Sequence, residues 1–310
     1  MKFIPEEVSA GFASHGMAYD AMYKALIAAT ETGTVTFPVI QAHGSSQGDT
    51  YAIKSSAAAG LAGLKVGSYW PGNEALGLPR HNSIILLFDQ SCGRIGAAVE
   101  AGRLNAYRTS AADAVAVDAL AREDSKTLAL FGAGHQASYE ARAIARFRPI
   151  EMVNVVSINE ARGEKFAEDL RNDGIAAQVS PAEEACRTAD IIVTATPATA
   201  PLFEADWVKP GTHVAGMGAD TAGKQEMPPD LFARGRLFCD LPSQSRVIGE
   251  FQHAPKNARL TAIGDVLAGR SEGRTSEEEI TIFDSSGISV QDLFMAQAIL
   301  DLVSAHGAEF

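Results

Sequence analysis

Apolar residues near the start of the chain recur at a helical period and then gather into short runs typical of strands. Met22, Leu26 and Ala29 follow one another at four- and three-residue spacing, which predicts a helix over His15–Ala29. Four later runs, separated by Gly, Pro and Asn, predict strands. These runs are Tyr51–Ala58, Leu61–Trp70, Ser83–Asp89 and Arg94–Glu100. The first part of the chain therefore indicates a mixed sheet with an antiparallel tendency.

An alanine-rich helix predicted over Leu104–Ala121 leads into a different rhythm, in which strands and helices alternate. The predicted strands are Thr127–Phe131, Met152–Ile158, Ala176–Val179, Asp190–Thr194 and His213–Gly216. The predicted helices are Gln136–Phe147, Ala161–Asn172 and Pro181–Thr188, with a terminal helix over Val290–Ala305. Such alternation predicts an α/β fold with a parallel sheet and right-handed crossovers.

The turn after the first of these parallel strands carries the sequence GAGHQA, residues 132–137. A G-x-G-x-x-A pattern between a strand and a helix is typical of dinucleotide binding. Gly132 permits the tight turn, Gly134 lets the backbone approach a pyrophosphate, and Ala137 lets the helix pack closely on the sheet. The N-terminus of the helix then offers N–H groups and a positive dipole end to the phosphates. We expect a Rossmann domain over roughly residues 120–283 that binds a nicotinamide dinucleotide.

The end of the second parallel strand is where such domains read the ribose of the cofactor. It carries Ser157, Ile158 and Asn159, without the acidic residue that favours NAD or the arginine that favours NADP. Ile158 is apolar where a 2′-phosphate needs a cation, so the pattern favours NAD and leaves NADP open. Arg162 follows in the predicted helix; we interpret it as a solvated residue of the helix surface, and contact with a 2′-phosphate is the alternative.

Composition restricts the kind of partner. The chain has 38 acidic residues against 26 lysines and arginines, a net charge of −12, whereas nucleic acids and anionic membranes select basic surfaces. No stretch resembles a signal peptide or a membrane span. Cys92, Cys186 and Cys239 are far apart and include no CxxC pair, which is typical of buried thiols in a reduced compartment. We expect a cytoplasmic protein without a metal site, a nucleic-acid partner or a membrane partner.

Several segments, taken in order, resemble the ornithine cyclodeaminase/mu-crystallin family over almost the whole chain. They are LKV (64–66) with PGN (71–73), HNS (81–83), AYRTSAA (106–112), GAGHQA (132–137), ADIIVTAT (189–196), PGTHVAGMGAD (210–220) and FDSSG (283–287). Each segment is short, but their order and spacing make the resemblance specific.

The resemblance implies two domains and a reaction class. A substrate-binding and dimerisation domain is expected from residues 1–119 and 284–310, with a Rossmann NAD(P)-binding domain from residues 120–283 between them. Members of the family include ornithine cyclodeaminases, amino-acid dehydrogenases and reductases of ketimines or imino acids. Their shared step is hydride transfer between a nicotinamide and the α-carbon of an amino or imino acid. The resemblance also implies a homodimer.

By the same resemblance, Lys65 and Arg108 hold the α-carboxylate of the substrate. That role is chemically apt, because arginine offers a planar fork of donors and lysine a compact charge. His81 is expected to face the same pocket. Asp220 is expected to act as an acid or base on the substrate's amino group, with Lys65 as the second catalytic residue. The expected cofactor contacts, besides the two loop glycines, are Thr109, His135, Gln136, Ser157, Asn159, Thr194, Ala195, Thr196, Met217, Gly218 and Ser286.

The chain departs from the family pattern at one place. The family usually carries another carboxylate-binding arginine after a proline that follows the first helix, yet residues 36–43 read TFPVIQAH. The substrate anchor must therefore differ near Val39, with compensation expected from the nearby polar residues and a substrate of another shape, such as a dicarboxylate. The candidates for that compensation are Gln41, His43, Arg80 and His81.

We therefore predict an NAD(P)H-dependent reductase of a small imino acid, such as iminosuccinate or pyrroline-2-carboxylate, or an amino-acid dehydrogenase running in reverse. The first alternative is an ornithine cyclodeaminase, in which the cofactor is reduced and reoxidised within one turnover. The second alternative is a protein that binds a dinucleotide and a small ligand without turnover. Lys65, Arg108 and Asp220 disfavour the last alternative, because a pure binding protein does not need an acid/base carboxylate.

Overall fold

The computed structural model describes residues 1–307 of the 310-residue chain. These residues form two compact units: Met1–Arg108 together with the chain from Ile288 onward, and Thr109–Gly287. The first unit is thus built from both ends of the sequence, and the second from its middle. Helix α3 (Gly102–Leu120) carries the boundary between Arg108 and Thr109.

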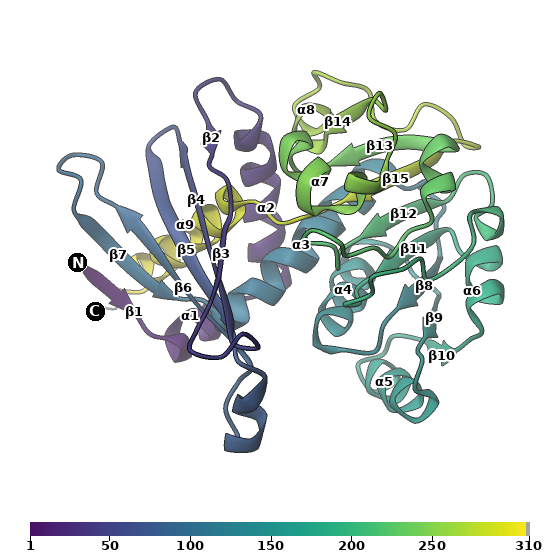
Figure 1. Ribbon diagram of the computed structural model, residues 1–310, viewed down its shortest axis with the longest axis horizontal. Helices are drawn as coiled ribbons and strands as arrows, with labels where there is room; N and C mark the ends of the chain where they lie inside the picture. Colours follow the sequence, from purple (N-terminus) through teal and green to yellow (C-terminus); the bar gives the residue numbers. More distant parts are fainter. Residues whose placement is uncertain (308–310) are drawn as a thin grey trace. The chain divides into compact units, whose positions relative to one another are not determined.

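The first unit is a mixed sheet with helices packed on it (Figure 1). Its strands run in the order β1-β7-β6-β5-β4-β2, and β3 also pairs with β4. The strand bounds are β1 (Lys2–Ile4), β2 (Val35–Thr36), β3 (Ile40–His43), β4 (Thr50–Ala58), β5 (Leu61–Tyr69), β6 (His81–Phe88) and β7 (Ile95–Glu100). The helices are α1 (Glu6–Phe12), α2 (His15–Ala29) and α9 (Ser289–Ala305), and α9 contacts α2 and strands β4, β5 and β6.

One face of this sheet lies under α9. Lys65 of β5 stands opposite Lys54 of β4 on one side and Ile85 of β6 on the other, so the three side chains form a row on this face. Two residues before Lys65, Gly63 allows a close approach: a Cβ there would lie 2.1 Å from the carbonyl oxygen of Leu86. The inner face is therefore packed tightly around the row that contains Lys65.

The second unit is an eight-stranded sheet whose strands all pair in parallel, in the order β10-β9-β8-β11-β12-β15-β13-β14. The strands are β8 (Thr127–Phe131), β9 (Met152–Val156), β10 (Ala177–Val179), β11 (Ile191–Thr194), β12 (His213–Gly216), β13 (Gly235–Cys239), β14 (Leu260–Ala262) and β15 (Ile280–Asp284). The helices are α4 (His135–Phe147), α5 (Glu160–Asn172), α6 (Ala182–Thr188), α7 (Pro242–Ile248) and α8 (Ile263–Leu267). The order reverses between β8 and β11, which is where open α/β sheets bind their ligands.

The predicted elements are confirmed, with ends that shift by at most two residues. The antiparallel tendency of the first sheet is confirmed for the pairs from β2 to β7, whereas β1 joins β7 in parallel. The strand predicted to run to Ile158 ends at Val156, because Ser157 turns the chain by accepting from the N–H of Asn159, the N-cap of α5. Strands β1, β2, β3, β13, β14 and β15 and helices α1, α7 and α8 were not predicted.

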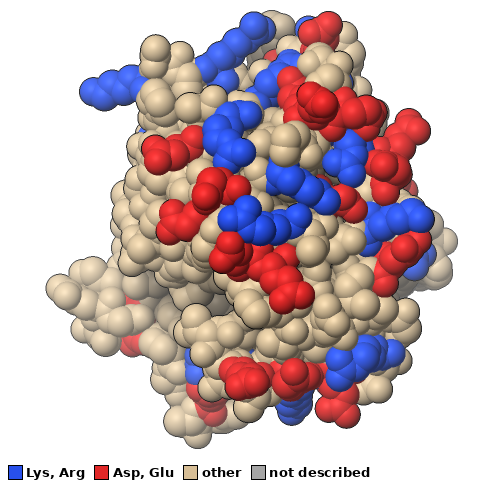
Figure 2. Space-filling model, turned by 90° about the vertical axis from the view of Figure 1, so that its right-hand side faces the viewer, with Lys and Arg blue, Asp and Glu red and all other residues tan. Residues whose placement is uncertain are grey.

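Within the part of the chain that the structure describes, no helix is both long and apolar enough to cross a bilayer. On the face shown in Figure 2, acidic and basic side chains are interspersed, without a continuous basic surface.

Candidate active site

The centre of the candidate site in the first unit is Lys65, whose side chain is almost fully buried. Its ammonium group donates to Asn105 Oδ1 at 2.7 Å and to Asp292 Oδ1 at 2.9 Å. Burial lowers the pKa of Lys65 to about 8, and the charges of Arg108 and Lys54 lower it as well, whereas Asp292 opposes the shift. The site thus holds an ammonium whose charge depends on anionic neighbours.

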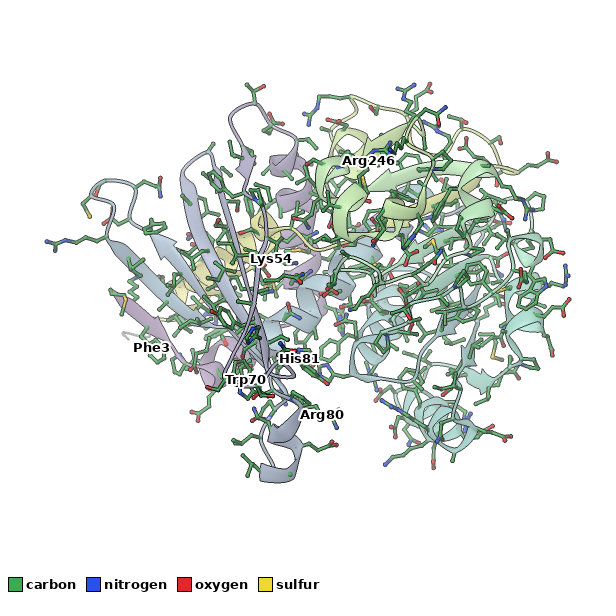
Figure 3. All side chains as sticks on the ribbon, viewed as in Figure 1. Phe3, Lys54, Trp70, Arg80, His81 and Arg246 are labelled. Atoms are coloured by element: carbon green, nitrogen blue, oxygen red, sulfur yellow. The ribbon has the colours of Figure 1, made fainter. Side chains whose placement is uncertain are left out.

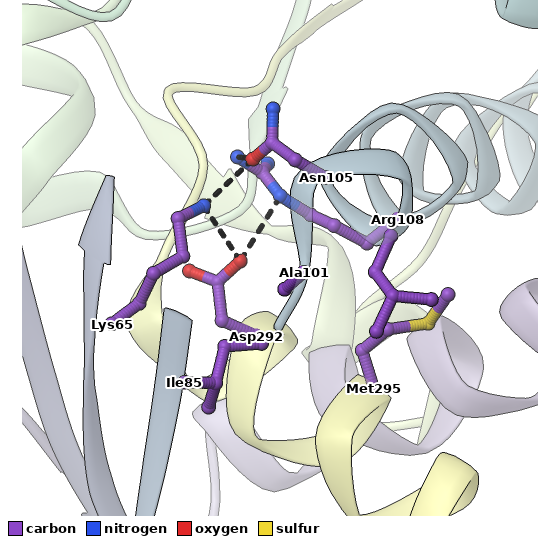
Figure 4. A pocket seen from close by; sticks show the side chains of 8 residues that line it. Lys65, Ile85, Ala101, Asn105, Arg108, Asp292 and Met295 are labelled. Atoms are coloured by element: carbon purple, nitrogen blue, oxygen red, sulfur yellow. Dashed lines mark hydrogen bonds and ion pairs between the residues drawn. The ribbon is translucent and has the colours of Figure 1, made fainter. Parts of the chain in front are cut away.

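Arg108 approaches the same place from α3 (Figure 4). Its Nη2 donates to Asn105 Oδ1 at 3.0 Å, and its Nη1 donates to Gln291 Oε1 at 3.4 Å. Its Nε lies 3.3 Å from Asp292 Oδ1, close enough for an ion pair but not directed as a hydrogen bond. The family resemblance implies that Lys65 and Arg108 bind the same substrate carboxylate. The structure brings the two side chains together around the carboxylate of Asp292.

Asp292 is that carboxylate, and it is fully buried in the first turn of α9. Burial alone would raise the pKa of Asp292, but the charges of Lys65, Arg108 and Lys54 hold it below its ordinary value. A pocket lies against this cluster, lined by Lys65, Ile85, Ala101, Leu104, Asn105, Arg108, Asp292 and Met295. Cationic and apolar side chains line this pocket together.

Three buried polar atoms of this cluster have no hydrogen-bond partner among the described residues: Arg108 Nε, Gln291 Nε2 and Asp292 Oδ2. Two of the three are donors. Buried donors without acceptors cost free energy, so native proteins pair them with protein, water or ligand. Acceptor oxygens of water or of a ligand can therefore pair with these donors.

The structure places His81 outside this pocket. It is exposed at the first position of β6, where its ring contacts Tyr69 with ring centroids 4.7 Å apart. His81 and Ile85 share a face of the strand, four residues apart, so His81 lies about 13 Å along the sheet from the row of Lys65. Figure 3 labels it beside the end of the strand. His81 is thus not among the residues that line this pocket, and its expected contact with the substrate stays a prediction.

The other residues expected to compensate for the missing arginine also lie outside the pocket lining. Arg80 pairs with Glu74. His43 places Nδ1 2.8 Å from the carbonyl oxygen of Gly44. Gln41 is exposed on β3. A further cation, Lys54, stands opposite Lys65 on the neighbouring strand. This lysine was not predicted as a site residue.

The glycine-rich loop of the second unit has the geometry expected of a phosphate cradle. Gly132 has a φ of +118°, and a Cβ there would lie 2.8 Å from the carbonyl oxygen of Ala195. Gly134 is the N-cap of α4 and has no side chain to cap the helix. Ala137 is fully buried, as the close helix packing requires. These residues fit a dinucleotide pyrophosphate, whose oxygens would take the place of a capping side chain at the helix N-terminus.

The residues expected at the ribose lie around the start of α5. Ser157 Oγ donates to the carbonyl oxygen of Asn159, and Asn159 Oδ1 accepts from the N–H of Arg162. Arg162 is exposed on the surface of α5, as expected, and its side chain also donates from Nε to the carbonyl oxygen of Ala133 at 2.9 Å. Ile158 is fully exposed beside it.

A buried carboxylate joins the two further loops expected to contact the cofactor. Glu226 Oε1 accepts from the N–H of Thr196 at 2.6 Å, and its Oε2 accepts from Thr194 Oγ1 at 2.9 Å and from the N–H of Gly218 at 2.8 Å. The chain ends of β11 and β12 are thereby tied together. Glu226 was not predicted as a site residue, because nothing in the sequence of its loop distinguishes it from a glutamate on the surface.

The remaining expected residues of the second unit lie after β12, after β15 or, for Thr109, in α3. Met217 is buried directly after β12. Ser286, after β15, accepts from Gln244 Nε2 at 2.9 Å. Thr109 is buried in α3. Asp220, in the loop after β12, is half-exposed and forms an ion pair with Lys224 at 2.6 Å.

Asp292, Asn105 and Gln291 were also missed by sequence analysis, although one signal pointed to two of them. Gln291 and Asp292 stand side by side at the start of a terminal helix that is otherwise rich in apolar residues. Both are fully buried. A charged residue within an apolar helix needs a buried partner, and Lys65 and Arg108 are those partners here.

A doubly wound parallel sheet with a glycine-rich phosphate cradle, in a chain that also holds a buried pair of cations in an apolar pocket, defines an NAD-dependent oxidoreductase. The chain belongs to the ornithine cyclodeaminase/mu-crystallin family, whose model matches residues 11–307.

Similar proteins agree with this assignment. An iminosuccinate reductase of Paracoccus denitrificans is 35% identical over 99% of this chain and 98% of its own length. Its structure in complex with NAD+ superposes with a TM-score of 0.94, covering 100% of this chain and 98% of that chain. An archaeal alanine dehydrogenase dimer with bound NAD has a TM-score of 0.92 at 30% identity, covering 100% and 98%.

A third structure, the Thermococcus litoralis Δ1-pyrroline-2-carboxylate reductase with NADH and L-proline, has a TM-score of 0.90 at 25% identity, covering 100% of this chain and 99% of that chain. The expected fold class and the expected NAD cofactor are thus confirmed.

Proposed function

We propose that this enzyme reduces a small imino acid to the corresponding amino acid and binds the substrate's carboxylate between Lys65 and Arg108. The observation that carries the proposal is the pair of orphaned buried donors, Arg108 Nε and Gln291 Nε2, beside two cations that share one carboxylate. A substrate carboxylate supplies the missing acceptors. The reductases of iminosuccinate and pyrroline-2-carboxylate among the similar proteins support this substrate class.

Each part of the pocket has a task in such a reduction. The dinucleotide, when bound, supplies the hydride. Lys65 and Arg108 fix the carboxylate and thereby orient the neighbouring imine carbon. Ile85, Leu104 and Met295 form an apolar wall that keeps water from an imine, which water hydrolyses. Asp220, which forms an ion pair with Lys224, is proposed to hold or move the proton at the substrate nitrogen.

The proposal includes two further features. The protein is a homodimer, as the archaeal alanine dehydrogenase is described to be. It acts in a reducing compartment such as the cytoplasm, which its three free cysteines support.

The test measures the consumption of NADH, by its absorbance, with each of several substrates. The panel contains oxaloacetate with ammonium, pyruvate with ammonium, and Δ1-pyrroline-2-carboxylate, with ornithine assayed separately for ammonia release. Arg108→Ala should lower kcat/KM by about 30- to 1000-fold, because it removes a buried charge-assisted anchor. NADH affinity should stay the same. Arg103→Ala, an exposed position on the same helix, is the matched control and should behave as the wild type.

Two results would contradict the proposal. Ornithine-dependent ammonia release without net NADH consumption would make the protein a cyclodeaminase. Tight NADH binding with no turnover of any imine in the panel would make it a binding protein.

A further inference from the structure

Lys54 stands directly opposite Lys65 on neighbouring antiparallel strands. Residues in such a pair point to the same side of the sheet, with Cβ atoms about 5 Å apart. Lys65 reaches Asp292 of α9, so the side they share is the face under that helix. Lys54 is half-buried there (Figure 3).

Two lysines in this arrangement repel each other. Like charges directly opposite on a sheet destabilise it, and the charge of Lys54 contributes to the lowered pKa of Lys65. The same charge acts on Asp292 and helps to keep its pKa low. Lys54 is therefore an electrostatic member of the cluster, in which three cations surround the single carboxylate of Asp292.

The neighbouring row of the sheet is made of small residues. Ala52, Gly67 and Ser83 stand opposite one another on the same face, two residues along the strands from the row of Lys54 and Lys65. A Cβ at Gly67 would lie 3.4 Å from Lys65 Cε, so the lysine side chain leans over the glycine. No bulky side chain of this row therefore separates the two lysines from the end of the face.

We propose that Lys54 is a third substrate-binding cation and that it gives the site a preference for imino acids with two carboxylates. One carboxylate is bound by Lys65 and Arg108, and the second by Lys54. This inference rests on the proposed imine reduction, and it names the substrate class.

The test compares two imines that differ in the second carboxylate: oxaloacetate with ammonium, and pyruvate with ammonium. In Lys54→Met, kcat/KM for the dicarboxylate should fall about 30-fold or more, and kcat/KM for the monocarboxylate by less than about threefold. Lys54→Arg should restore most of the dicarboxylate activity, because it keeps the charge. Lys24→Met removes a lysine from the exposed surface of α2 and serves as the matched control.

Binding without turnover separates this inference from the proposed function. With NAD+ present, succinate should raise Tm more than propionate does in the wild type, and Lys54→Met should abolish that difference. An enzyme that reduces no imine but keeps this Lys54-dependent preference would contradict only the proposed reaction. The role of Lys54 would be overturned if kcat/KM in Lys54→Met fell equally for both imines or for neither. A preference for succinate that survives in Lys54→Met would overturn it as well.

Discussion

Two glycines of the dinucleotide loop are needed for different reasons. Gly132 is required by the fold, because its φ is positive and a Cβ would clash with the backbone of Ala195. Gly134 has an extended backbone, and a Cβ there would meet only the Arg162 guanidinium, at 3.5 Å. The folded protein alone therefore tolerates a side chain at Gly134, whereas the approaching pyrophosphate does not.

Substitution should separate these two roles. Gly134→Ala should leave Tm within about 2 °C of the wild type and weaken NADH binding at least about tenfold, measured by fluorescence titration. Gly132→Ala should lower the free energy of unfolding by about 1–3 kcal/mol through backbone strain. NADH binding by Gly134→Ala with wild-type affinity would show that the phosphates do not lie against this residue.

Site residues that stand in recognisable sequence motifs were predicted. Site residues that only come into contact with them in the folded chain were not. Lys65 and Arg108 stand in recognisable segments, and the structure brings them together. Asp292 lies 227 residues from Lys65 in the sequence, so no local pattern joins them. The same holds for Lys54: the loss of an arginine near Val39 was visible, but the pairing of β4 with β5 was needed to find the cation in that row.

Between two helices of the second unit, a pair of acids is buried. Asp113 of α3 and Glu140 of α4 are both fully buried, and Glu140 Oε1 accepts from Gln136 Nε2 at 2.7 Å. Burial raises the pKa of Asp113 to about 7, and a hydrogen bond with Glu140 opposes that rise. The pair therefore holds a proton near neutral pH, and it supports the helix that begins at the phosphate cradle.

This proton makes stability depend on pH. An unfolded Asp113 loses its proton near pH 4 and the folded one near pH 7, so stability falls as the pH rises through that window. In Asp113→Asn the fall should be smaller by about 2–4 kcal/mol, because the amide donates to Glu140 at every pH. Urea unfolding at pH 5 and pH 8 measures the fall in the free energy of unfolding. Asp169→Asn, on the exposed surface of α5, is the control. Parallel pH profiles for wild type and Asp113→Asn would refute the shared proton.

Long periodic elements were predicted well, and short or late ones were missed. Helix α2 and strands β8 and β12 have the predicted bounds, because each has a clear period or a flanking glycine. Strand β15 lies between β12 and β13, so its place depends on a crossover that no local pattern encodes. Strand β14 has only three residues, and β13 pairs with β15 and β14, which are both distant in the sequence. Local propensity decides where an element forms, but tertiary pairing decides which short runs become strands.

The outer face of the first sheet is apolar and partly exposed. Ile53, Val66 and Ile84 stand in one row, and Leu64 and Leu86 in the next, all on the side opposite Lys65. All five are only half-buried, whereas Ile85 and Leu87 on the inner side are buried. Apolar surface of this extent is typical of a protein interface, and we expect a second copy of the chain to cover it.

Light scattering tests this expectation for the whole molecule. The wild type should have a mass near twice the 32.6 kDa of one chain. Val66→Glu should shift the mass toward one chain, because a charge in an apolar interface core is costly. Ile158→Glu, at a fully exposed residue of the second unit, should remain dimeric. A wild-type monomer at micromolar concentration would contradict the homodimer.

The first unit is assembled from both ends of the sequence, and this has a consequence for the protein as it leaves the ribosome. Strands β4 and β5 emerge early with Lys54 and Lys65, but Asp292 follows only after the whole second unit has been synthesised. At about 5–20 residues per second, the interval of 227 residues lasts roughly 10–45 s. During that time the two lysines lack the carboxylate that neutralises them. A nascent chain halted before α9 should therefore bind NADH while its first sheet stays open to protease, and translation of the last helix completes the anion-binding site.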